Sequence, residues 1–205
     1  LKHALGEAYE RYERLHNTKD EMRGVPTGFK ELDNLLAGFQ KSDLIILAAR
    51  PSVGKTSLAL DIARRAAVNH NVPVGIFSLE MSAQQLVDRI LSAQSEVDAW
   101  KLRTGKQLSL EEDFTRIRDA LDVLSKAPIM IDDQPGTNII KMRSTARRWK
   151  SEKGLGLIIV DYLQLMSGSG DRGKNRDQEI GEITKGLKQM AKEMQVPVIC
   201  LSQLS

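Results

Sequence analysis

The stretch Ala49-Arg50-Pro51-Ser52-Val53-Gly54-Lys55-Thr56 decides the fold of this chain. It follows an apolar run, residues 44–48, and leads directly into a helical pattern that starts at Ser57. In a phosphate-binding loop, N–H groups at a helix N-terminus surround the phosphates, a Lys reaches the β and γ phosphates, and a Ser or Thr hydroxyl holds Mg²⁺. Gly54, Lys55 and Thr56 fill the last three places of that pattern. Residues 49–57 are therefore predicted to bind ATP and Mg²⁺.

Ala49 departs from the motif, which ordinarily has Gly in that place. A methyl group is tolerated there if φ stays below zero. The alternative is a chance Gly-Lys-Thr sequence at a helix cap. The preceding strand pattern argues against it, and so does one apolar helical face after the loop, which carries Leu58, Ile62, Ala63 and Ala66.

Composition is that of a globular protein. The 205 residues are 41% hydrophobic with a net charge of +3, which fits one sizeable domain and is weak support for a nucleic-acid partner. The lone Cys200 lies in an apolar run and is expected to be buried. Three scattered His residues and the lack of a long apolar run argue against a structural metal and against a membrane span. We expect a cytoplasmic protein, bacterial or phage-encoded.

Apolar strand candidates alternate with helical segments over most of the chain. The candidates are residues 44–48, 74–79, 129–131, 157–160 and 198–201. This alternation predicts an α/β fold with a mostly parallel sheet flanked by helices. A last helix is expected over 178–194, with its apolar side chains inward: Ile180, Ile183, Leu187, Met190 and Met194. Two capping boxes are expected, Ser82 with Gln85 and Ser109 with Glu112.

Residues 1–17 are predicted to form an amphipathic linker helix. Its apolar positions fall on one face: Leu5, Ala8, Tyr9, Tyr12 and Leu15. Either this helix packs on its own domain, or it connects to a neighbouring subunit. The polar, turn-rich residues 17–28 favour a connector ahead of a domain over 18–205.

Two acidic residues compete to support Mg²⁺ from the end of another strand. Asp161 follows a β-branched run typical of a central strand, residues 157–160. Asp132 follows a shorter run and precedes a turn signal, Gln134-Pro135-Gly136, typical of a strand that ends at the surface. Asp161 is favoured, and Asp132 stays an alternative.

ATP hydrolysis also requires a group that orients and deprotonates water. Tyr162, not Glu, follows Asp161, so the base must come from elsewhere. Glu80 ends a strand candidate and would lie on the same sheet edge as Lys55 and Asp161. The alternative role for Glu80 is a carboxylate favoured by the helix dipole ahead of Ser82.

Five blocks in order resemble the ATPase domain of DnaB-type replicative helicases. They are Gly24-Val25-Pro26-Thr27-Gly28-Phe29 with Glu31-Leu32-Asp33, the loop at 48–56, Phe77-Ser78-Leu79-Glu80-Met81-Ser82, Val160-Asp161-Tyr162-Leu163-Gln164-Leu165 and Leu201-Ser202-Gln203-Leu204-Ser205. The resemblance implies a RecA-like P-loop core, homo-hexameric rings with ATP between subunits, and ATP-driven translocation on single-stranded DNA at the replication fork. A helicase loader is a further implied partner. Ala49 in place of Gly is normal for that family.

The same resemblance implies roles for individual residues. Lys55 and Thr56 would bind phosphate and Mg²⁺, and Asp161 would support the metal. Glu80 would activate water. Gln203 would sense the γ-phosphate, although from the residues alone it reads as a capping amide beside Ser202.

Two departures from the family matter. Its amino-terminal domain, which engages primase, is missing, which argues against a primase contact. The sequence also stops at Ser205, immediately before the region in which the family carries its arginine finger and a second channel loop. We therefore expect an incomplete ATPase domain that hydrolyses ATP weakly alone.

A Gly-rich segment after Asp161, residues 167–176, carries three cations, Arg172, Lys174 and Arg176. Composition alone favours a solvent-exposed loop. Similarity to ring helicases favours a loop that follows DNA phosphates in a central channel.

The sequence is also compatible with rival functions. The nearest is a RecA-like recombinase or other ring ATPase, and more distant ones are a small-molecule kinase and an inert nucleotide-binding module. A kinase would require an Arg-rich lid, which the sequence does not display.

Overall fold

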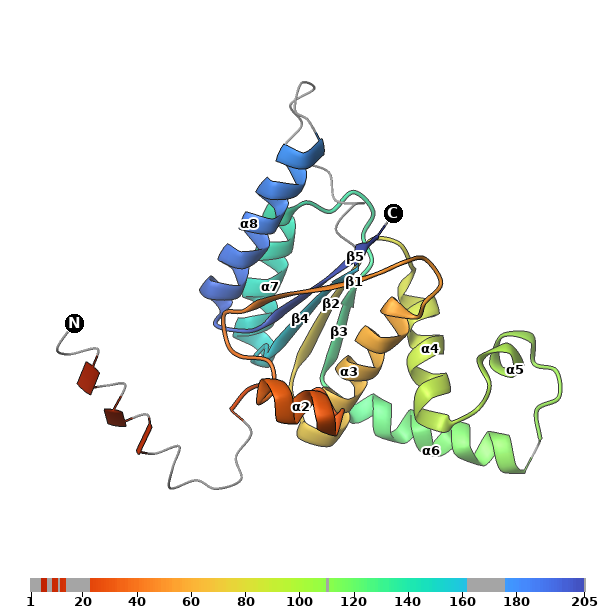
Figure 1. Ribbon diagram of the computed structural model, residues 1–205. Coiled ribbons are helices and arrows are strands. Elements are labelled where there is room, and N and C mark those ends of the chain that lie inside the picture. Colours follow the sequence, from red (N-terminus) through yellow and green to blue (C-terminus); the bar gives the residue numbers. More distant parts are fainter. Residues whose placement is uncertain are drawn as a thin grey trace.

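The computed structural model describes residues 5–6, 9–10, 12–13, 23–109, 111–161 and 176–204, with side chains in the last range from Ile180 onward. Its centre is a five-stranded, wholly parallel sheet in the order β1-β5-β4-β2-β3 (Figure 1). The strands are β1 (Leu44–Ala49), β2 (Val74–Ser78), β3 (Ile129–Asp132), β4 (Leu157–Asp161) and β5 (Val198–Gln203). Because all five run in one direction, their carboxyl ends meet at one edge of the sheet.

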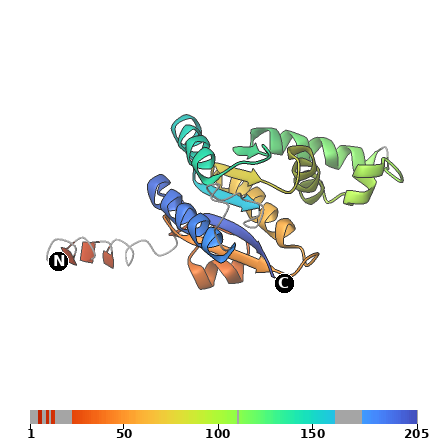
Figure 2. The same ribbon diagram turned by 90° about the horizontal axis from the view of Figure 1, so that it is seen from above.

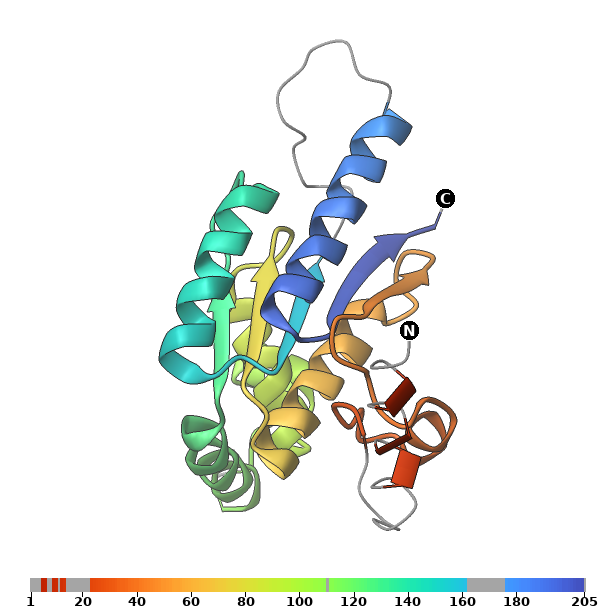
Figure 3. The same ribbon diagram turned by 90° about the vertical axis from the view of Figure 1, so that its left-hand side faces the viewer.

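Helices cover both faces of the sheet. α3 (Lys55–His70) packs on one face with α4 (Ala83–Ser95) beside it, and α6 (Glu112–Lys126) packs against α4. α7 (Ile139–Lys153) and α8 (Arg176–Met194) pack on the other face, which is turned to the viewer in Figure 3. Two short helices, α2 (Lys30–Leu36) and α5 (Ala99–Thr104), lie outside these layers. In Figures 1 and 2, α5 lies beside α4 and away from the sheet.

β4 is buried on both faces, as the apolar pattern of a central parallel strand requires. Leu157 and Ile159 join the apolar cluster under α3 and α4. Ile158 and Val160 join the cluster under α7 and α8. Full burial of each such side chain contributes about 1.5–3 kcal/mol, so the alternation along β4 holds both helical layers.

Gly75 in β2 leaves room for Trp149 of α7. A Cβ at Gly75 would lie 2.6 Å from Trp149 Cε3. The indole instead stacks on Phe77, with ring centroids 4.9 Å apart. This contact sets the approach of α7 to the sheet.

The segment that enters the domain is tied to α3. Asp33 Oδ1 accepts a hydrogen bond from the N–H of Thr27 at 2.8 Å, and Asp33 Oδ2 accepts one from Gly28 at 3.1 Å. Gly28 has a φ of 80°, a conformation that favours glycine. Its carbonyl accepts a hydrogen bond from Arg65 Nη1 at 3.1 Å, and the Arg65 guanidinium lies 4.9 Å from the Phe29 ring centroid.

The predicted α/β fold with a parallel sheet is confirmed. All five expected strands form, β2 ending one residue early and the other four extending by one or two residues. The capping box of Ser82 and Gln85 is complete. Cys200 is buried, and so are the four expected inward positions of α8 from Ile183 onward. None of the described helices is long and apolar enough to cross a bilayer.

On the expected apolar face of α3, Ile62, Ala63 and Ala66 are buried, whereas Leu58 in the first turn is 38% exposed, ahead of the part that packs on the sheet. One local expectation is wrong. Ser109 does not form a capping box with Glu112. Its hydroxyl accepts from the Glu112 N–H at 3.3 Å, but the carboxylate that accepts the Ser109 N–H belongs to Asp113.

Candidate functional site

The loop between β1 and α3 has the geometry of a phosphate cradle. β1 ends at Ala49, and α3 begins at Lys55 after a turn of exposed residues. Gly54 is the N-cap of α3 with a φ of 99°, which is strained for any residue with a Cβ. The N–H groups of the first turn of α3 begin at Lys55, where the helix dipole favours an anion.

Ala49 fits its position because it belongs to a strand. It lies in parallel register with Gln203, and its carbonyl accepts a hydrogen bond from the N–H of Leu204 at 3.0 Å. Its φ is not positive, so the methyl group is tolerated as expected. This pairing also brings Gln203, the exposed last residue of β5, to the start of the loop.

Asp161 and Thr56 meet at the centre of the site although they are 105 residues apart. Thr56 Oγ1 donates a hydrogen bond to Asp161 Oδ2 at 2.9 Å. Asp161 is only 2% exposed, and its Oδ1 has no hydrogen-bond partner in the described part of the chain. A buried carboxylate oxygen without a partner is costly unless a further donor or cation meets it.

The electrostatics of Asp161 point the same way. Burial raises the pKa of its carboxyl group above the usual range, and the charge of Glu80 raises the pKa further. The hydrogen bond from Thr56 and the charges of Lys55 and Arg89 act in the opposite direction. A nearby divalent cation would favour the charged form of this carboxyl group and so oppose the effect of burial on its pKa.

The donors at this position fit Mg²⁺. This hard cation takes oxygen ligands, keeps several waters and is bound through one or two protein groups plus substrate phosphates. The Thr56 hydroxyl and the Asp161 carboxylate supply two such groups. Among the described residues, no cluster of three or more His, Cys, Asp or Glu side chains could hold a metal.

Glu80 lies just beyond the end of β2, which stops at Ser78. The Leu79 N–H bonds to the Asp161 carbonyl at 2.7 Å, which holds this turn against the end of β4. Glu80 is exposed, and its charge acts on Asp161. The structure therefore brings Glu80, Lys55, Thr56 and Asp161 to one edge of the sheet.

Asp132 does not take part in this cluster. It ends the edge strand β3, and its Oδ1 accepts a hydrogen bond from the N–H of Gln134 in the following turn at 3.1 Å.

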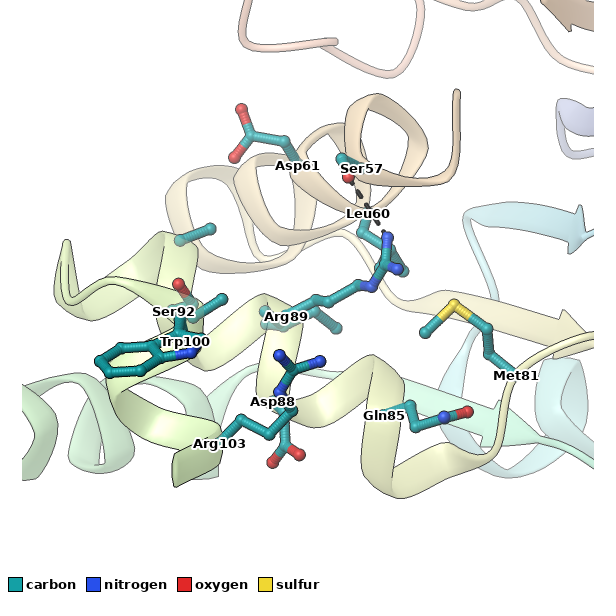
Figure 4. Close-up of a pocket in the computed structure, with 13 residues that line it drawn as sticks. Ser57, Leu60, Asp61, Met81, Gln85, Asp88, Arg89, Ser92, Trp100 and Arg103 are labelled. Atoms are coloured by element: carbon teal, nitrogen blue, oxygen red, sulfur yellow. Dashed lines mark hydrogen bonds between the residues drawn. The ribbon is translucent and has the colours of Figure 1, made fainter. Parts of the chain in front are cut away.

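Arg89 is a residue that sequence reasoning missed. From α4, its Nη1 donates to Ser57 Oγ at 3.4 Å, and its charge lowers the pKa of Asp161 (Figure 4). The available signal was the capping box at Ser82, which fixes the helical phase of α4. To infer from that phase that Arg89 points toward α3, one must also know how α4 packs on α3.

A pocket of about 510 Å³ lies beside Arg89, between α3, α4 and α5 (Figure 4). Leu60 and Ile90 form part of its wall, and Trp100 and Arg103 of α5 border it. It does not contain Lys55, Thr56 or Asp161, so it adjoins the loop without being the phosphate site.

Three predicted DNA-binding residues lie outside the part of the chain whose side chains the structure describes. Residues 162–175, which carry Arg172 and Lys174, lie outside the described residues, and so do Ser205 and the side chain of Arg176.

Comparison with known proteins agrees with this geometry. The sequence profile of the DnaB-like helicase C terminal domain matches residues 24–205. The chain is 53% identical to the replicative DNA helicase DnaB of Geobacillus stearothermophilus and 52% identical to the replicative DNA helicase DnaC of Bacillus subtilis, in each case over all 205 residues. It spans 45% of the length of both relatives.

Solved structures show the same fold. A DnaB-like replicative helicase, studied for its interactions with primase, superposes with a TM-score of 0.89 at 32% identity, covering 100% of this chain and 48% of that one. A second solved structure, of an ATPase domain, superposes with a TM-score of 0.89 at 31% identity, covering 98% of this chain and 70% of that one. With the loop at 49–56, the Thr56–Asp161 bond and these matches, the chain belongs to the DnaB-like helicase C-terminal domain family.

Proposed function

We propose that this chain is the motor domain of a replicative DNA helicase. It binds ATP with Mg²⁺ at residues 49–57 and uses hydrolysis to move along single-stranded DNA and unwind duplex at the replication fork. The observation that carries the proposal is the Thr56–Asp161 hydrogen bond at the carboxyl end of β4, next to the loop. Family membership supports a helicase over a recombinase.

Lys55 and Thr56 contact the nucleotide in this proposal. Lys55 would neutralise β and γ phosphate charge, and the hydroxyl of Thr56 and the carboxylate of Asp161 would hold Mg²⁺, Asp161 through water. The ion, when bound, would supply positive charge that stabilises the transferring phosphate.

Glu80 is the proposed general base, and Gln203 the proposed γ-phosphate contact. Glu80 is exposed beside Asp161, so it can accept a proton from a water in line with the γ-phosphate. Gln203 ends β5 in register with Ala49 at the start of the loop, which supports the proposed contact.

Two substitutions in an assembled ring test these roles. Glu80→Gln should keep ATP binding and lower turnover by about 10²- to 10⁴-fold. Lys55→Ala should weaken both binding and turnover, because it removes the cation that meets the phosphates. Near-normal hydrolysis by Glu80→Gln would exclude Glu80 as the base, and undiminished ATP binding by Lys55→Ala would overturn the nucleotide site itself.

The proposed assembly is a homo-hexamer linked through residues 1–17. Leu5, Tyr9 and Tyr12 are 60%, 69% and 60% exposed in the single chain. Helical spacing brings these residues to one face. The proposed docking site on another copy is the pocket between α3, α4 and α5, which has Leu60 and Ile90 in its wall and Trp100 at its border.

Replacing Leu5 and Tyr12 with Ser should weaken hexamers and leave the melting temperature of the single chain almost unchanged. Sedimentation velocity and thermal melting measure the two effects. A large loss of stability in the single chain would assign the helix to its own domain.

DNA contact by Arg172, Lys174 and Arg176 remains a prediction, as do a helicase loader as partner and a cytoplasmic location. In an assembled ring, each phosphate that is no longer neutralised should lower the slope of log affinity against log salt by roughly 0.7 on single-stranded DNA. An unchanged slope after replacing all three cations with Ala would make this an ordinary surface loop.

A further inference from the structure

The positive charge of this protein is concentrated on one face. α7 carries six cations and a single carboxylate, Glu152; the cations are Lys141, Arg143, Arg147, Arg148, Lys150 and Lys153. From Ile180 onward, α8 adds three more cations, Lys185, Lys188 and Lys192, and two carboxylates, Glu182 and Glu193. Nine cations against three carboxylates exceed the net charge of +3 of the whole chain, so the rest of the molecule is close to neutral or acidic. We call these nine cations the basic face.

The basic face belongs to one side of the sheet. α7 and α8 pack side by side over the same apolar cluster, and both lie toward the viewer in Figure 3. α3, which begins in the phosphate-binding loop, packs on the opposite side. The basic face can therefore bind a ligand without contacting the nucleotide.

Intramolecular pairing uses only part of this charge. Glu193 accepts hydrogen bonds from both Arg143 and Arg147, which share one carboxylate. Lys150 Nζ donates to the Leu155 carbonyl at 2.9 Å. Lys141, Arg148 and Lys153 are exposed and form no ion pair with any residue that the structure describes.

The chemistry of this face fits phosphate better than protein. Protein interfaces concentrate aromatic side chains and are depleted in Lys, whereas interfaces with DNA are strongly positive. Among the described residues of α7 and α8, Ile140 is the one large hydrophobic side chain that is conspicuously exposed. Trp149, the aromatic residue of α7, is buried.

The same absence favours duplex DNA over single strands that are held by base stacking. Sites of that kind stack the bases on aromatic side chains in a groove. Duplex DNA keeps its bases stacked inside and carries its phosphates on the outside, so a cationic surface without aromatic side chains can bind it. α7 is about 22 Å long at 1.5 Å per residue, which spans more than half of one duplex turn of about 34–36 Å.

We propose that the basic face on α7 and α8 is a sequence-independent binding surface for duplex DNA, held through its phosphates. This surface goes beyond the proposed ATP-driven motor, because it lies across the sheet from the nucleotide and requires no hydrolysis.

A closed duplex tests the proposal. The probe is a duplex of about 24 base pairs, or roughly 80 Å at 3.4 Å per pair, sealed by a hairpin at each end so that it has no free single-stranded tail. The 205-residue chain, without nucleotide, is titrated with this probe at several salt concentrations. The test variant combines Lys141→Gln, Arg148→Gln and Lys153→Gln. The control combines Arg116→Gln, Arg118→Gln and Lys126→Gln on α6, so each variant removes three exposed cations.

The α7 variant should lower the slope of log affinity against log salt by about 2.7, or about 0.9 for each phosphate that is no longer neutralised. The α6 control should leave the slope unchanged. An unchanged slope in the α7 variant, or equal changes in both, would overturn the proposal. If the α7 variant lowered the slope more for single-stranded oligothymidine than for the closed duplex, or if polyglutamate of the same charge competed equally, the face would bind a different partner and the proposal would also be overturned.

Cross-linking supplies a second readout. Burial raises the pKa of the Cys200 thiol to about 12, so this residue does not compete for a thiol-directed photo-cross-linker. Arg148→Cys, labelled in this way, should cross-link to the closed duplex, and Arg118→Cys should not. Cross-linking from position 118 alone would contradict the proposed surface. Neither result depends on ATP turnover, so failure here leaves the proposed motor function standing.

Discussion

β4 and β3 both end in an aspartate, but the two carboxylates differ in burial and in hydrogen-bond partner. Both strands flank β2, and both finish with an aspartate after an apolar run. Asp161 is buried and accepts a hydrogen bond from the Thr56 hydroxyl at 2.9 Å. Asp132 is half-buried and accepts a hydrogen bond from the N–H of Gln134 in its own turn.

The difference comes from position in the sheet and not from the local sequence. β4 lies between β2 and β5, close to β1 and the loop that follows it, whereas β3 is an edge strand. The carboxylate at the end of β4 therefore interacts with Lys55, Thr56 and Glu80, while the carboxylate of Asp132 at the end of β3 accepts a hydrogen bond from its own turn. The aspartate of the central strand therefore belongs to the candidate nucleotide site, whereas the aspartate of the edge strand stabilises the turn that follows it.

The largest contrast should appear when the two strands lose core volume. Ile159 of β4 is 1% exposed, and Ile159→Ala should cost about 2–5 kcal/mol of the free energy of unfolding. Ile131→Ala in β3 should cost less, because Ile131 is only half-buried. Urea denaturation of the chain measures both, and equal losses would mean that β3 contributes to the core as fully as β4.

Activity should separate the two aspartates next. Asp161→Asn should reduce Mg²⁺-dependent ATP turnover in an assembled ring by about 10- to 100-fold, the range for groups that hold a metal through its outer shell. Asp132→Asn should remain near the unsubstituted level. Mg²⁺ titrations of both variants provide the comparison. A larger defect at Asp132 would reverse the assignment.

In the absence of nucleotide, Asp161→Asn should raise the stability of the protein, although it lowers ATP turnover. Burial raises the pKa of Asp161 above its ordinary value of 3.8, so the folded protein binds this proton more tightly than the unfolded chain does. The contribution of Asp161 to stability therefore falls as pH rises from that ordinary value through the raised one. Asp161→Asn removes this loss and should melt at a higher temperature near neutral pH. If the variant melts lower there, the buried charge is already compensated within the protein.

The smallest effect should be at the edge. Asp132→Ala removes the acceptor for the Gln134 N–H, which should cost about 0.5–1.5 kcal/mol. Asp132→Asn keeps an acceptor oxygen and serves as the control. Thermal melting of the pair shows whether Asp132 does more than hold its turn: an equal loss in both variants would indicate a role for its charge.

Sequence reasoning found the features that depend on short stretches. The phosphate loop, the five strands and the Ser82 capping box each have a local signal, and Asp161 was preferred over Asp132 from the longer, β-branched run before it. Features that depend on how helices and strands pack together could not be predicted from the sequence. The contact of Arg89 with Ser57 joins two helices whose relative placement no local pattern encodes. The exposure of Leu58 has the same origin, since helical periodicity assigns a face but not where the neighbouring sheet ends.

The two tryptophans of the chain are intrinsic fluorescence probes of two different regions of the domain. Trp149 is 8% exposed and stacked on Phe77, so its emission should be blue-shifted, inaccessible to acrylamide and lost only on global unfolding. Trp100 is 45% exposed at the border of the pocket between α3, α4 and α5, so a soluble quencher should reach it readily. A single fluorescence sample can therefore follow two events separately. A fall in acrylamide quenching of Trp100 indicates that the pocket is occupied, and a red shift of the Trp149 emission indicates that the packing between α7 and the sheet is lost.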